Sequence, residues 1–296
     1  MAKTYGTWTY FNGVFNDDYD DTLFGTAEND IIYGLGGDDV INLEGRFLGN
    51  PLLRGTDEAY GGDGNDKIFG SSSRDILDGG DGLDQVYGGG GNDDIYGGAD
   101  TDWLLGEDGK DDLFGGDGCD QLYGGEDYDE LYGGELSDWL DGGSGDDVLM
   151  GGEDADHLTG GSDLDQFAFA FENLFVGDSR ASNPDTIWDF NHNYDTIVLK
   201  GPGFEPFPST KYVEDTIGAL HGVGAGYDAA KKHAESLLTG GKTYAFVTDQ
   251  VDGYLFVDCF QGNGEGFDEG VYAGVEVGII LKGLTSISDF DPSNIL

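Results

Sequence analysis

A nonapeptide repeat between residues 16 and 168 constrains the fold of this chain more than any other feature. Laid out in nines from Asn16, the frame holds for 17 nonapeptides without a slip. The sixth position is Asp in 16 of them, the first is Gly in 14, and the eighth is aliphatic or Phe in 15. The stretch Gly61 to Phe69 (GGDGNDKIF) shows the pattern in full. Such a fixed period indicates stacked structural repeats.

The two parts of each nonapeptide have different conformational preferences. The Gly-Gly-x-Gly-x-Asp part forms turns, because glycine adopts positive φ without steric cost, and the x-apolar-x part is a very short strand. One nonapeptide cannot bury its apolar residue alone, so two form a flattened coil of 18 residues, and the coils stack about 4.8 Å apart. The predicted fold is therefore all-β: a parallel β-roll (a β-helix solenoid, 18 residues per turn). The two predicted inner ladders are Ile68, Val86, Leu104, Leu122, Leu140, Leu158 and Leu77, Ile95, Leu113, Leu131, Leu149, Phe167.

The charge of the chain restricts its partners. It has 13 basic and 60 acidic residues, for a net charge of −47, so phosphates are repelled and no nucleic-acid partner is predicted. A composition this acidic is typical of disordered chains. The regular apolar eighth position, however, gives each coil a side chain to bury. Together these observations predict a chain that is loose without a cation and folded with one.

Stacking also predicts where the cation binds. The sixth-position carboxylates form one column along each edge of the roll, where they repel one another unless a cation lies between successive loops. Calcium accepts 6–8 oxygen ligands in flexible geometry, whereas magnesium requires a tighter octahedron, and zinc would require His or Cys, which the loops lack apart from Cys119. We expect on the order of ten calcium ions. The predicted aspartate ligands are Asp30, Asp39, Asp57, Asp66, Asp75, Asp84, Asp93, Asp102, Asp111, Asp120, Asp129, Asp138, Asp147, Asp156 and Asp165.

Several nonapeptides depart from the pattern. Residues 43–51 have no Asp at the sixth position, whereas residues 52–60 keep Asp57; both still fill their frames, and we expect a bulged or looped turn with a weakened site there. Residues 70–78 carry serines in place of glycines. Four nonapeptides have Asp at the fourth position, either as extra calcium ligands or, the favoured interpretation, as solvated charge: Asp100, Asp127, Asp154 and Asp163.

Aromatic residues recur at positions that face outward. The ninth residues Phe69, Tyr87 and Tyr123 line one predicted sheet. The candidate ligand-binding residues, whose rings would stack on sugar rings, are Tyr96, Phe114 and Tyr132 at ninth positions of the other sheet, with Trp103 and Trp139 at seventh positions. Strand propensity and mutual stacking explain the same pattern, and this simpler explanation is slightly favoured.

The repeats resemble the RTX (repeats-in-toxin) calcium-binding β-roll family over roughly half the chain. The segments that begin at Asp165 (DQFAF), Asp185 (DTIWDF) and Asp195 (DTIVL) resemble the post-roll region of serralysin-type proteases and of alginate-epimerase R-modules, where strands continue and close the roll. The resemblance implies calcium-dependent folding outside the cell, export by type I secretion machinery through an uncleaved C-terminal signal, and polysaccharide as a ligand. The sequence shows no Sec-type signal peptide at its start, and no apolar run approaches the length of a membrane span.

The C-terminal part is less regular. We expect strands at 243–248, 254–257 and 275–281 and one helix within 227–238. The acidic loop 258–268 is a further candidate calcium site. Two cysteines, Cys119 and Cys259, give no disulfide framework, and a free thiol is expected at Cys119. The predicted domains are an N-terminal cap (1–15), the RTX roll (16–168), and roll-closing strands with a small β-rich lobe and a secretion signal (169–296).

The sequence contains no recognisable catalytic constellation. The four histidines form no HExxH motif, and the segment before Lys242 lacks the leading glycine of a P-loop, because Ser236 occupies that position. The predicted function is therefore non-enzymatic: an extracellular protein that folds on calcium binding and holds polysaccharide or a cell surface. The alternatives are a self-associating structural subunit of a layer, matrix or filament and, third, an enzyme with activity in the C-terminal lobe.

Overall fold

The computed structural model describes residues 22–24, 31–43, 56–170, 184–191, 193–200, 212–216, 230, 244–248, 252–257 and 277–282. Their regular elements are all strands; in addition, the single residue Ala230 is helical and fully buried. The all-β prediction is confirmed. The chain divides into two compact units, residues 1–150 with 161–163 and residues 151–160 with 164–296. The division falls within β14 (Val148–Gly152) and β15 (His157–Ser162).

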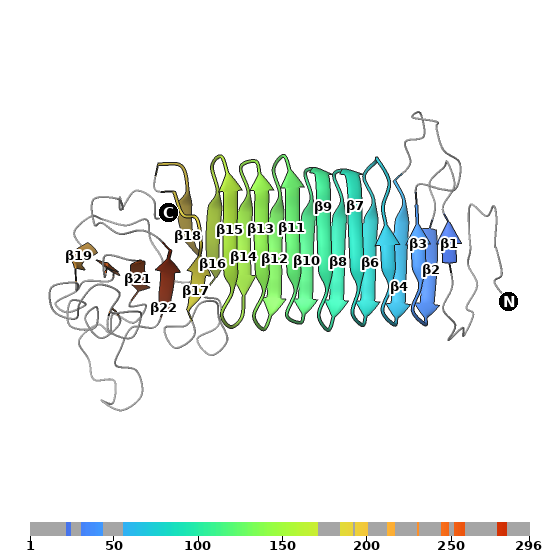
Figure 1. Cartoon of the computed structure of the whole chain (residues 1–296), viewed down its shortest axis with the longest axis horizontal. Coiled ribbons are helices and arrows are strands. Elements are labelled where there is room, and N and C mark those ends of the chain that lie inside the picture. The colour runs from blue at the N-terminus through green and yellow to red at the C-terminus, as the bar shows by residue number, and fades with distance from the viewer. Residues whose placement is uncertain are drawn as a thin grey trace, which may run out of the picture. The chain divides into compact units, whose positions relative to one another are not determined.

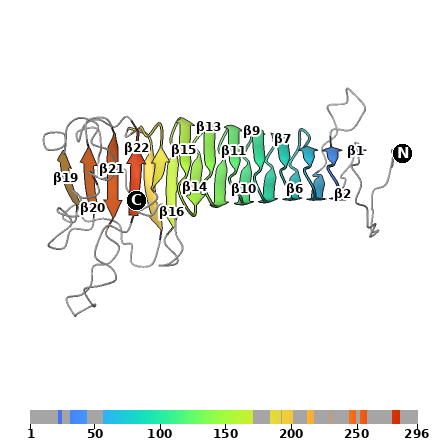
Figure 2. The ribbon, with the colours of Figure 1, turned by 60° about the horizontal axis from the view of Figure 1, so that its bottom comes forward.

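The first unit is a parallel β-roll with two sheets, and the predicted architecture is confirmed (Figure 1). One sheet contains, in spatial order, β1 (Thr22–Phe24), β3 (Val40–Asn42), β5 (Lys67–Phe69), β7 (Gln85–Gly91), β9 (Trp103–Gly109), β11 (Gln121–Glu126) and β13 (Trp139–Ser144). The other contains β2 (Ile31–Gly36), β4 (Glu58–Asp63), β6 (Ile76–Asp81), β8 (Asp94–Ala99), β10 (Asp112–Asp117) and β12 (Glu130–Glu135), followed by β14. In the turned view of Figure 2 the odd-numbered strands of the roll from β7 to β15 lie along one side and the even-numbered strands along the other.

The register of the strands aligns the eighth-position side chains. In the odd sheet Val86 pairs with Leu104, and in the even sheet Ile95 pairs with Leu113, so that each partner lies two nonapeptides further along the chain. All four side chains are fully buried. Both predicted inner ladders are therefore confirmed within the first unit, and the coils share one aliphatic core.

One coil is longer than the two nonapeptides expected. Ile41 pairs with Ile68 and Ile32 with Ala59, so that each partner lies three nonapeptides further along the chain. The register therefore spans one nonapeptide more here than in the rest of the roll, in agreement with the bulged or looped turn expected at residues 43–60. The physical reason lies in 43–51, which offers neither an inward Asp at its sixth position nor an aliphatic residue at its eighth. The chain rejoins the roll at Asp57, which is 4% exposed.

The loops stack too closely for side chains at some glycine positions. Gly62 has φ of 113° and Gly64 has φ of 139°, in the region that L-residues rarely adopt. A Cβ added to Gly64 would lie 1.9 Å from the carbonyl oxygen of Gly37, one coil earlier in the stack. Glycine at the fourth position therefore allows one loop to lie directly on the next.

The second unit continues the parallel pattern and then reverses it. β15 pairs in parallel with β17 (Asp185–Ile187), which pairs in parallel with β22 (Val277–Leu281). β22 and β21 (Gly253–Val257) are antiparallel, as are β21 and β20 (Tyr244–Thr248), and β20 is parallel to β19 (Tyr212–Thr216). β16 (Gln166–Ala170), the neighbour of β14 in the even sheet, pairs in parallel with β18 (Thr196–Lys200). The three C-terminal strands predicted from the sequence agree with β20, β21 and β22 to within two residues.

Other C-terminal expectations fall on residues that the structure does not describe. The helix expected within 227–238 lies outside the described residues apart from Ala230. The acidic loop 258–268 with Cys259, the terminal segment 283–296 and the N-terminal cap 1–15 also lie outside them. These remain predictions.

Replacing Leu113 by Ala tests the inner ladder. Leu113 is fully buried between Ile95 and Leu131, so truncation should lower the free energy of unfolding in saturating calcium by about 2–5 kcal/mol. Leu83, which is 56% exposed, provides the control, and its replacement by Ala should change the value by less than about 0.5 kcal/mol. Urea unfolding followed by circular dichroism measures both. Equal effects would contradict the ladder.

Candidate metal sites

The sixth-position aspartates form two buried columns in the first unit. Each lies at the end of a loop, directly before a strand, because the nonapeptide places its turn part immediately before its strand part. The column before the odd strands contains Asp39, Asp66, Asp84, Asp102, Asp120 and Asp138, and the column before the even strands contains Asp57, Asp75, Asp93, Asp111, Asp129 and Asp147. Each is at most 4% exposed. Of the other predicted ligands, Asp156 and Asp165 lie in the second unit and are also buried, and Asp30 lies outside the described residues.

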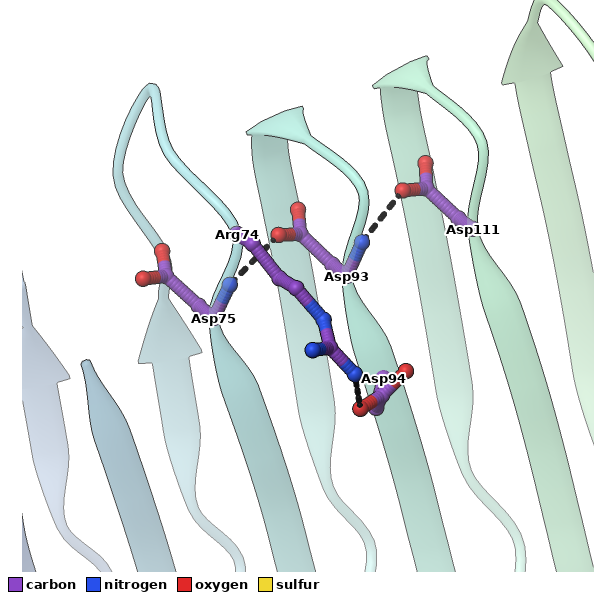
Figure 3. Close-up of polar contacts among 5 residues, drawn as sticks. All are labelled: Arg74, Asp75, Asp93, Asp94 and Asp111. Carbon is purple, nitrogen blue, oxygen red and sulfur yellow. Dashed lines mark hydrogen bonds and ion pairs between the residues drawn. The ribbon is translucent and has the colours of Figure 1, made fainter. Parts of the chain in front are cut away.

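One carboxylate oxygen of each aspartate connects successive coils. Oδ1 of Asp84 accepts the backbone N–H of Asp66, one coil earlier, at 2.7 Å. In the other column, Oδ1 of Asp93 accepts the N–H of Asp75 and Oδ1 of Asp111 accepts the N–H of Asp93, both at 2.8 Å (Figure 3). The aspartate side chains therefore point into the stacked loops, where Oδ1 accepts a backbone N–H for which the strand ladder provides no acceptor.

The second carboxylate oxygen has a different environment. In seven of these aspartates Oδ2 is buried and has no hydrogen-bond partner within the described part of the chain: Asp66, Asp84, Asp93, Asp102, Asp111, Asp120 and Asp129. A buried, unsatisfied polar atom costs about 1–3 kcal/mol, and more when it is charged. Seven of them in ordered columns indicate that a cation is the missing partner.

A backbone carbonyl lies beside each of these oxygens. A Cβ added to Gly61 would lie 2.2 Å from Oδ2 of Asp66 and 2.4 Å from the carbonyl oxygen of Gly79 in the next coil. The same pair of oxygens borders Gly97, where the distances are 2.5 Å to Oδ2 of Asp102 and 2.7 Å to the carbonyl of Gly115. At the first glycine of the repeat, a carboxylate oxygen and a carbonyl oxygen therefore lie close together with no hydrogen-bond donor between them. Such a set of oxygen ligands fits a hard cation.

The ligand chemistry favours calcium. Among the described residues, no group of three or more His, Cys, Asp or Glu side chains comes together as a metal site. Each loop supplies one inward carboxylate, so backbone carbonyls and water must provide the remaining ligands. Calcium accepts such a mixed oxygen set, whereas structural zinc requires His or Cys. Cys119 is a free, exposed thiol at the fifth position of its repeat, in agreement with its prediction.

Burial makes the column carboxylates unusually basic. Loss of solvation raises the pKa of Asp84 to about 7 and those of Asp93, Asp102 and Asp129 to about 8. The hydrogen bond at Oδ1 lowers each value, and neighbouring carboxylates raise it again. The pKa values of Asp111, Asp120 and Asp147 are raised to about 6 for the same main reason. Without a bound cation, ionising these groups destabilises the fold.

The loop at Asp75 is an exception. Oδ2 of Asp75 accepts the backbone N–H of Ser71 at 2.7 Å, and Oδ1 accepts the N–H of Asp57 at 3.0 Å. Arg74 in the same loop pairs with Asp94 (Figure 3), although its side chain is 58% exposed and the pair therefore contributes little stability. Both oxygens of Asp75 are satisfied by the protein itself. The serine-containing repeat thus forms a turn that does not depend on a cation.

The fourth-position aspartates lie at the surface. Asp100, Asp127, Asp154 and Asp163 are exposed and have φ between 74° and 85°, a left-handed conformation that Asp tolerates better than most residues. Their charge still acts on the columns: Asp100 raises the pKa of Asp84 and Asp102. They add negative potential beside the candidate sites.

Two aspartates that the sequence-based ligand set omits also connect successive coils through Oδ1 in the second unit, although Oδ2 of Asp195 accepts the N–H of Asn191 at 2.6 Å, as Oδ2 of Asp75 accepts that of Ser71. Asp185 is 0% exposed and begins β17, and Asp195 is 3% exposed and directly precedes β18. Oδ1 of Asp185 accepts the N–H of Asp156 at 3.0 Å, and Oδ1 of Asp195 accepts the N–H of Asp165 at 3.3 Å. The available signal was the Asp-Thr-Ile triplet at both positions, which repeats the sixth to eighth positions of the nonapeptide.

The five candidate ligand-binding residues do not share one face. Tyr96, Phe114 and Tyr132 lie on β8, β10 and β12 of the even sheet, whereas Trp103 and Trp139 lie on β9 and β13 of the odd sheet. On the even sheet neighbouring rings stack at centroid distances of 5.0 Å and 4.9 Å. The predicted mutual stacking is therefore present there.

A parallel β-roll with buried, unsatisfied aspartate oxygens in its loops belongs to the class of cation-binding solenoids. The family of the RTX calcium-binding nonapeptide repeat (4 copies) matches residues 15–45, 60–95, 69–104, 96–131 and 132–167. The repeat block of this chain therefore belongs to the RTX calcium-binding repeat family. The matches pass over residues 46–59, within the long coil. No curated protein matches the chain, and the described residues contain no helix long and apolar enough to cross a membrane.

Matched substitutions distinguish the two kinds of loop. Asp102→Asn removes a carboxylate whose Oδ2 has no partner, so it should shift the calcium midpoint of folding upward, lower the number of bound ions and stabilise the metal-free roll. Asp75→Asn removes an acceptor for Ser71, so it should destabilise the metal-free roll by about 1–3 kcal/mol and leave the number of bound calcium ions unchanged. Calorimetric calcium titration measures the midpoint and the number of bound ions, and the residual β-signal in chelator, followed by circular dichroism, reports the stability of the metal-free roll. The reverse ranking of the two variants would contradict the assignment.

The raised pKa values also predict how pH affects the metal-free protein. An unfolded Asp has a pKa of about 3.9, below the folded values of about 6 to 8, so the folded form binds more protons between these limits. In chelator, stability should therefore be highest at about pH 4 and fall as pH rises to about 8. The β-signal in chelator across this range, followed by circular dichroism, measures it. In saturating calcium the decline should be abolished, and a rise in stability with pH in chelator would contradict burial of the carboxylates as the cause.

Proposed function

We propose that this chain is a secreted RTX protein that folds when it binds calcium outside the cell and then holds polysaccharide or a cell surface, without catalysing a reaction. The observation that carries the proposal is the set of seven buried Oδ2 atoms without a hydrogen-bond partner in the described roll. The membership of the repeat block in the RTX family identifies calcium as the cation.

The loop chemistry supports calcium as a folding trigger. At low calcium and neutral pH, folding must bury carboxylates whose ionised form burial disfavours and whose charges repel one another. A ligand that binds only the folded form stabilises it by mass action, by about 4 kcal/mol when its concentration is a thousand times its dissociation constant. On the order of ten ions would neutralise less than half of the −47 charge. The folded protein would thus remain strongly acidic and soluble.

The same switch supports export before folding. RTX repeat proteins are typically secreted, and calcium is scarce inside cells and abundant outside them. A chain whose aspartate columns prevent folding at low calcium would reach type I secretion machinery in a loose form. Extracellular calcium would then fold it after export. Polysaccharide binding is supported by the exposed aromatic residues on both sheets, of which Tyr96, Trp103 and Trp139 are 40–43% exposed.

A calcium titration followed by far-UV circular dichroism tests the trigger. We expect a cooperative change from coil to β-structure on addition of calcium, reversal by chelator, and little effect of magnesium at the same concentration. A full β-signal in chelator would refute the switch, because the roll would then tolerate its carboxylate columns without a cation.

Self-association into a layer, matrix or filament is the second candidate function. It is favoured by the exposure of Trp103 and Trp139, each 43%, on a β-sheet surface, since an exposed apolar surface often marks a protein interface. Light scattering in calcium, with no glycan present, distinguishes it: assembly predicts growth of particle mass with protein concentration, whereas a glycan-binding monomer predicts constant mass.

A further inference from the structure

On the odd sheet of the roll, the outward seventh and ninth positions carry no carboxylate over the four consecutive strands from β5 to β11, and the acidic residues of these strands (Glu107, Asp108 and Glu126) lie toward their C-terminal ends. Its seventh-position residues are Lys67, Gln85, Trp103, Gln121 and Trp139, aligned in register from β5 to β13. The corresponding row of the even sheet is Glu58, Ile76, Asp94, Asp112 and Glu130. The chain has 60 acidic residues, so most of its surface disfavours a partner without positive charge. The row of seventh-position residues on the odd sheet has no carboxylate, and such a partner can approach there. We call the outer surface of β5 to β13 the odd face; its one acidic side chain at a seventh or ninth position is Asp141, on β13.

The two tryptophans on the odd face are spaced along the roll. Trp103 and Trp139 each pair in register with Gln121 on the strand between them, so their side chains originate about 10 Å apart, two strand spacings. Each is 43% exposed. A spacing of this size is comparable to one disaccharide step of an extended polysaccharide, so a chain lying along the roll axis would meet the two indoles two sugar units apart.

The glutamines between the aromatic residues have oriented amides. Oε1 of Gln85 accepts hydrogen bonds from Lys67 Nζ at 3.1 Å and from the hydroxyl of Tyr87 at 3.4 Å. Oε1 of Gln121 accepts one from the hydroxyl of Tyr123 at 3.4 Å. Within the described residues, neither Nε2 donates a hydrogen bond to the protein. These bonds occupy the amide oxygens and leave the N–H donors for hydroxyl groups of a ligand.

The ring arrangement differs between the two faces. On the even sheet, Phe114 is stacked between Tyr96 and Tyr132 at interplanar angles of 8° and 4°, so both of its ring faces are covered. On the odd face Leu105 separates Tyr87 from Tyr123, which interrupts such a stack, and Trp103 stacks on Tyr123 at a ring-centroid distance of 5.7 Å and an interplanar angle of 30°. The odd face therefore presents two indoles on alternate strands, with the amide of Gln121 on the strand between them.

We propose that the odd face binds an uncharged, extended polysaccharide along the roll axis, with Trp103 and Trp139 packing against sugar rings and Gln85 and Gln121 donating hydrogen bonds to hydroxyl groups. This inference rests on the proposed polysaccharide-binding function and assigns its face and ligand class. The single cation in the row, Lys67, contacts the rings of Phe69 and Tyr87. The face thus has little positive charge to attract an acidic polysaccharide, which the rest of the chain would repel.

Native affinity electrophoresis in calcium tests the inference, with hydroxyethyl cellulose as the uncharged probe and alginate as the acidic one. We expect hydroxyethyl cellulose to retard the protein and Trp103→Ala with Trp139→Ala to weaken that binding by about tenfold or more. Tyr96→Ala is the matched control, because Tyr96 is 40% exposed on the even sheet, and it should leave binding unchanged. Gln121→Glu should weaken binding without removing an aromatic ring. Circular dichroism in calcium verifies that each variant folds.

The other outcomes separate this inference from the proposed function. Retardation by alginate alone, or loss of binding in Tyr96→Ala but not in the double Trp variant, would overturn the odd-face assignment and leave polysaccharide binding intact. No retardation by either probe, with a normal calcium-dependent fold, would count against both. A calcium-dependent dimer that the double Trp variant abolishes would show that the odd face joins two copies of the chain, and would also overturn the assignment.

Discussion

The burial of one carboxylate per nonapeptide is the constraint on which the rest of this structure depends. Each sixth-position aspartate uses Oδ1 to satisfy a backbone N–H of the preceding coil, as Asp84 does for Asp66, and thereby helps fix the spacing of the loops. In seven of the described loops the same placement buries Oδ2 beside a backbone carbonyl and away from any donor. An interaction that orders the stack thus also creates an electrostatic penalty that increases with every coil added.

The penalty explains both the dependence on a cation and the exception to it. Where a loop contains glycines, the backbone offers Oδ2 no donor, and a divalent ion is the physically reasonable partner. Where the loop contains Ser71 and Arg74, the N–H of Ser71 reaches Oδ2 of Asp75, and the loop is complete without metal. A roll that mixes the two kinds of loop can keep one turn formed while the others await calcium. Its response to calcium is therefore a property of individual loops as well as of the repeat.

The two sheets share one core but have different outer surfaces. Inner positions repeat with little variation because each must fill the same space between the sheets, as Leu104 and Leu122 do. Outer positions are free of that restraint, and the seventh residues are acidic on most even strands and uncharged or basic on the odd ones. Because side chains in register stack along a parallel sheet, any such bias extends along the roll. This is how a short repeat can produce a long surface of one chemical character.

The nine-residue frame predicted the architecture, both inner ladders and all but two of the described buried aspartates, because it fixes which residues face inward. It also predicted a bulged or looped turn at residues 43–60. It could not show that the coil from Ile41 to Ile68 spans three nonapeptides, since a coil of three fits the period as well as a coil of two. Nor could it distinguish Asp75 from Asp93, because the partner of an oxygen depends on backbone direction in the loop. Asp185 and Asp195 lie beyond the frame, and only strand pairing with β15 and β16 placed them.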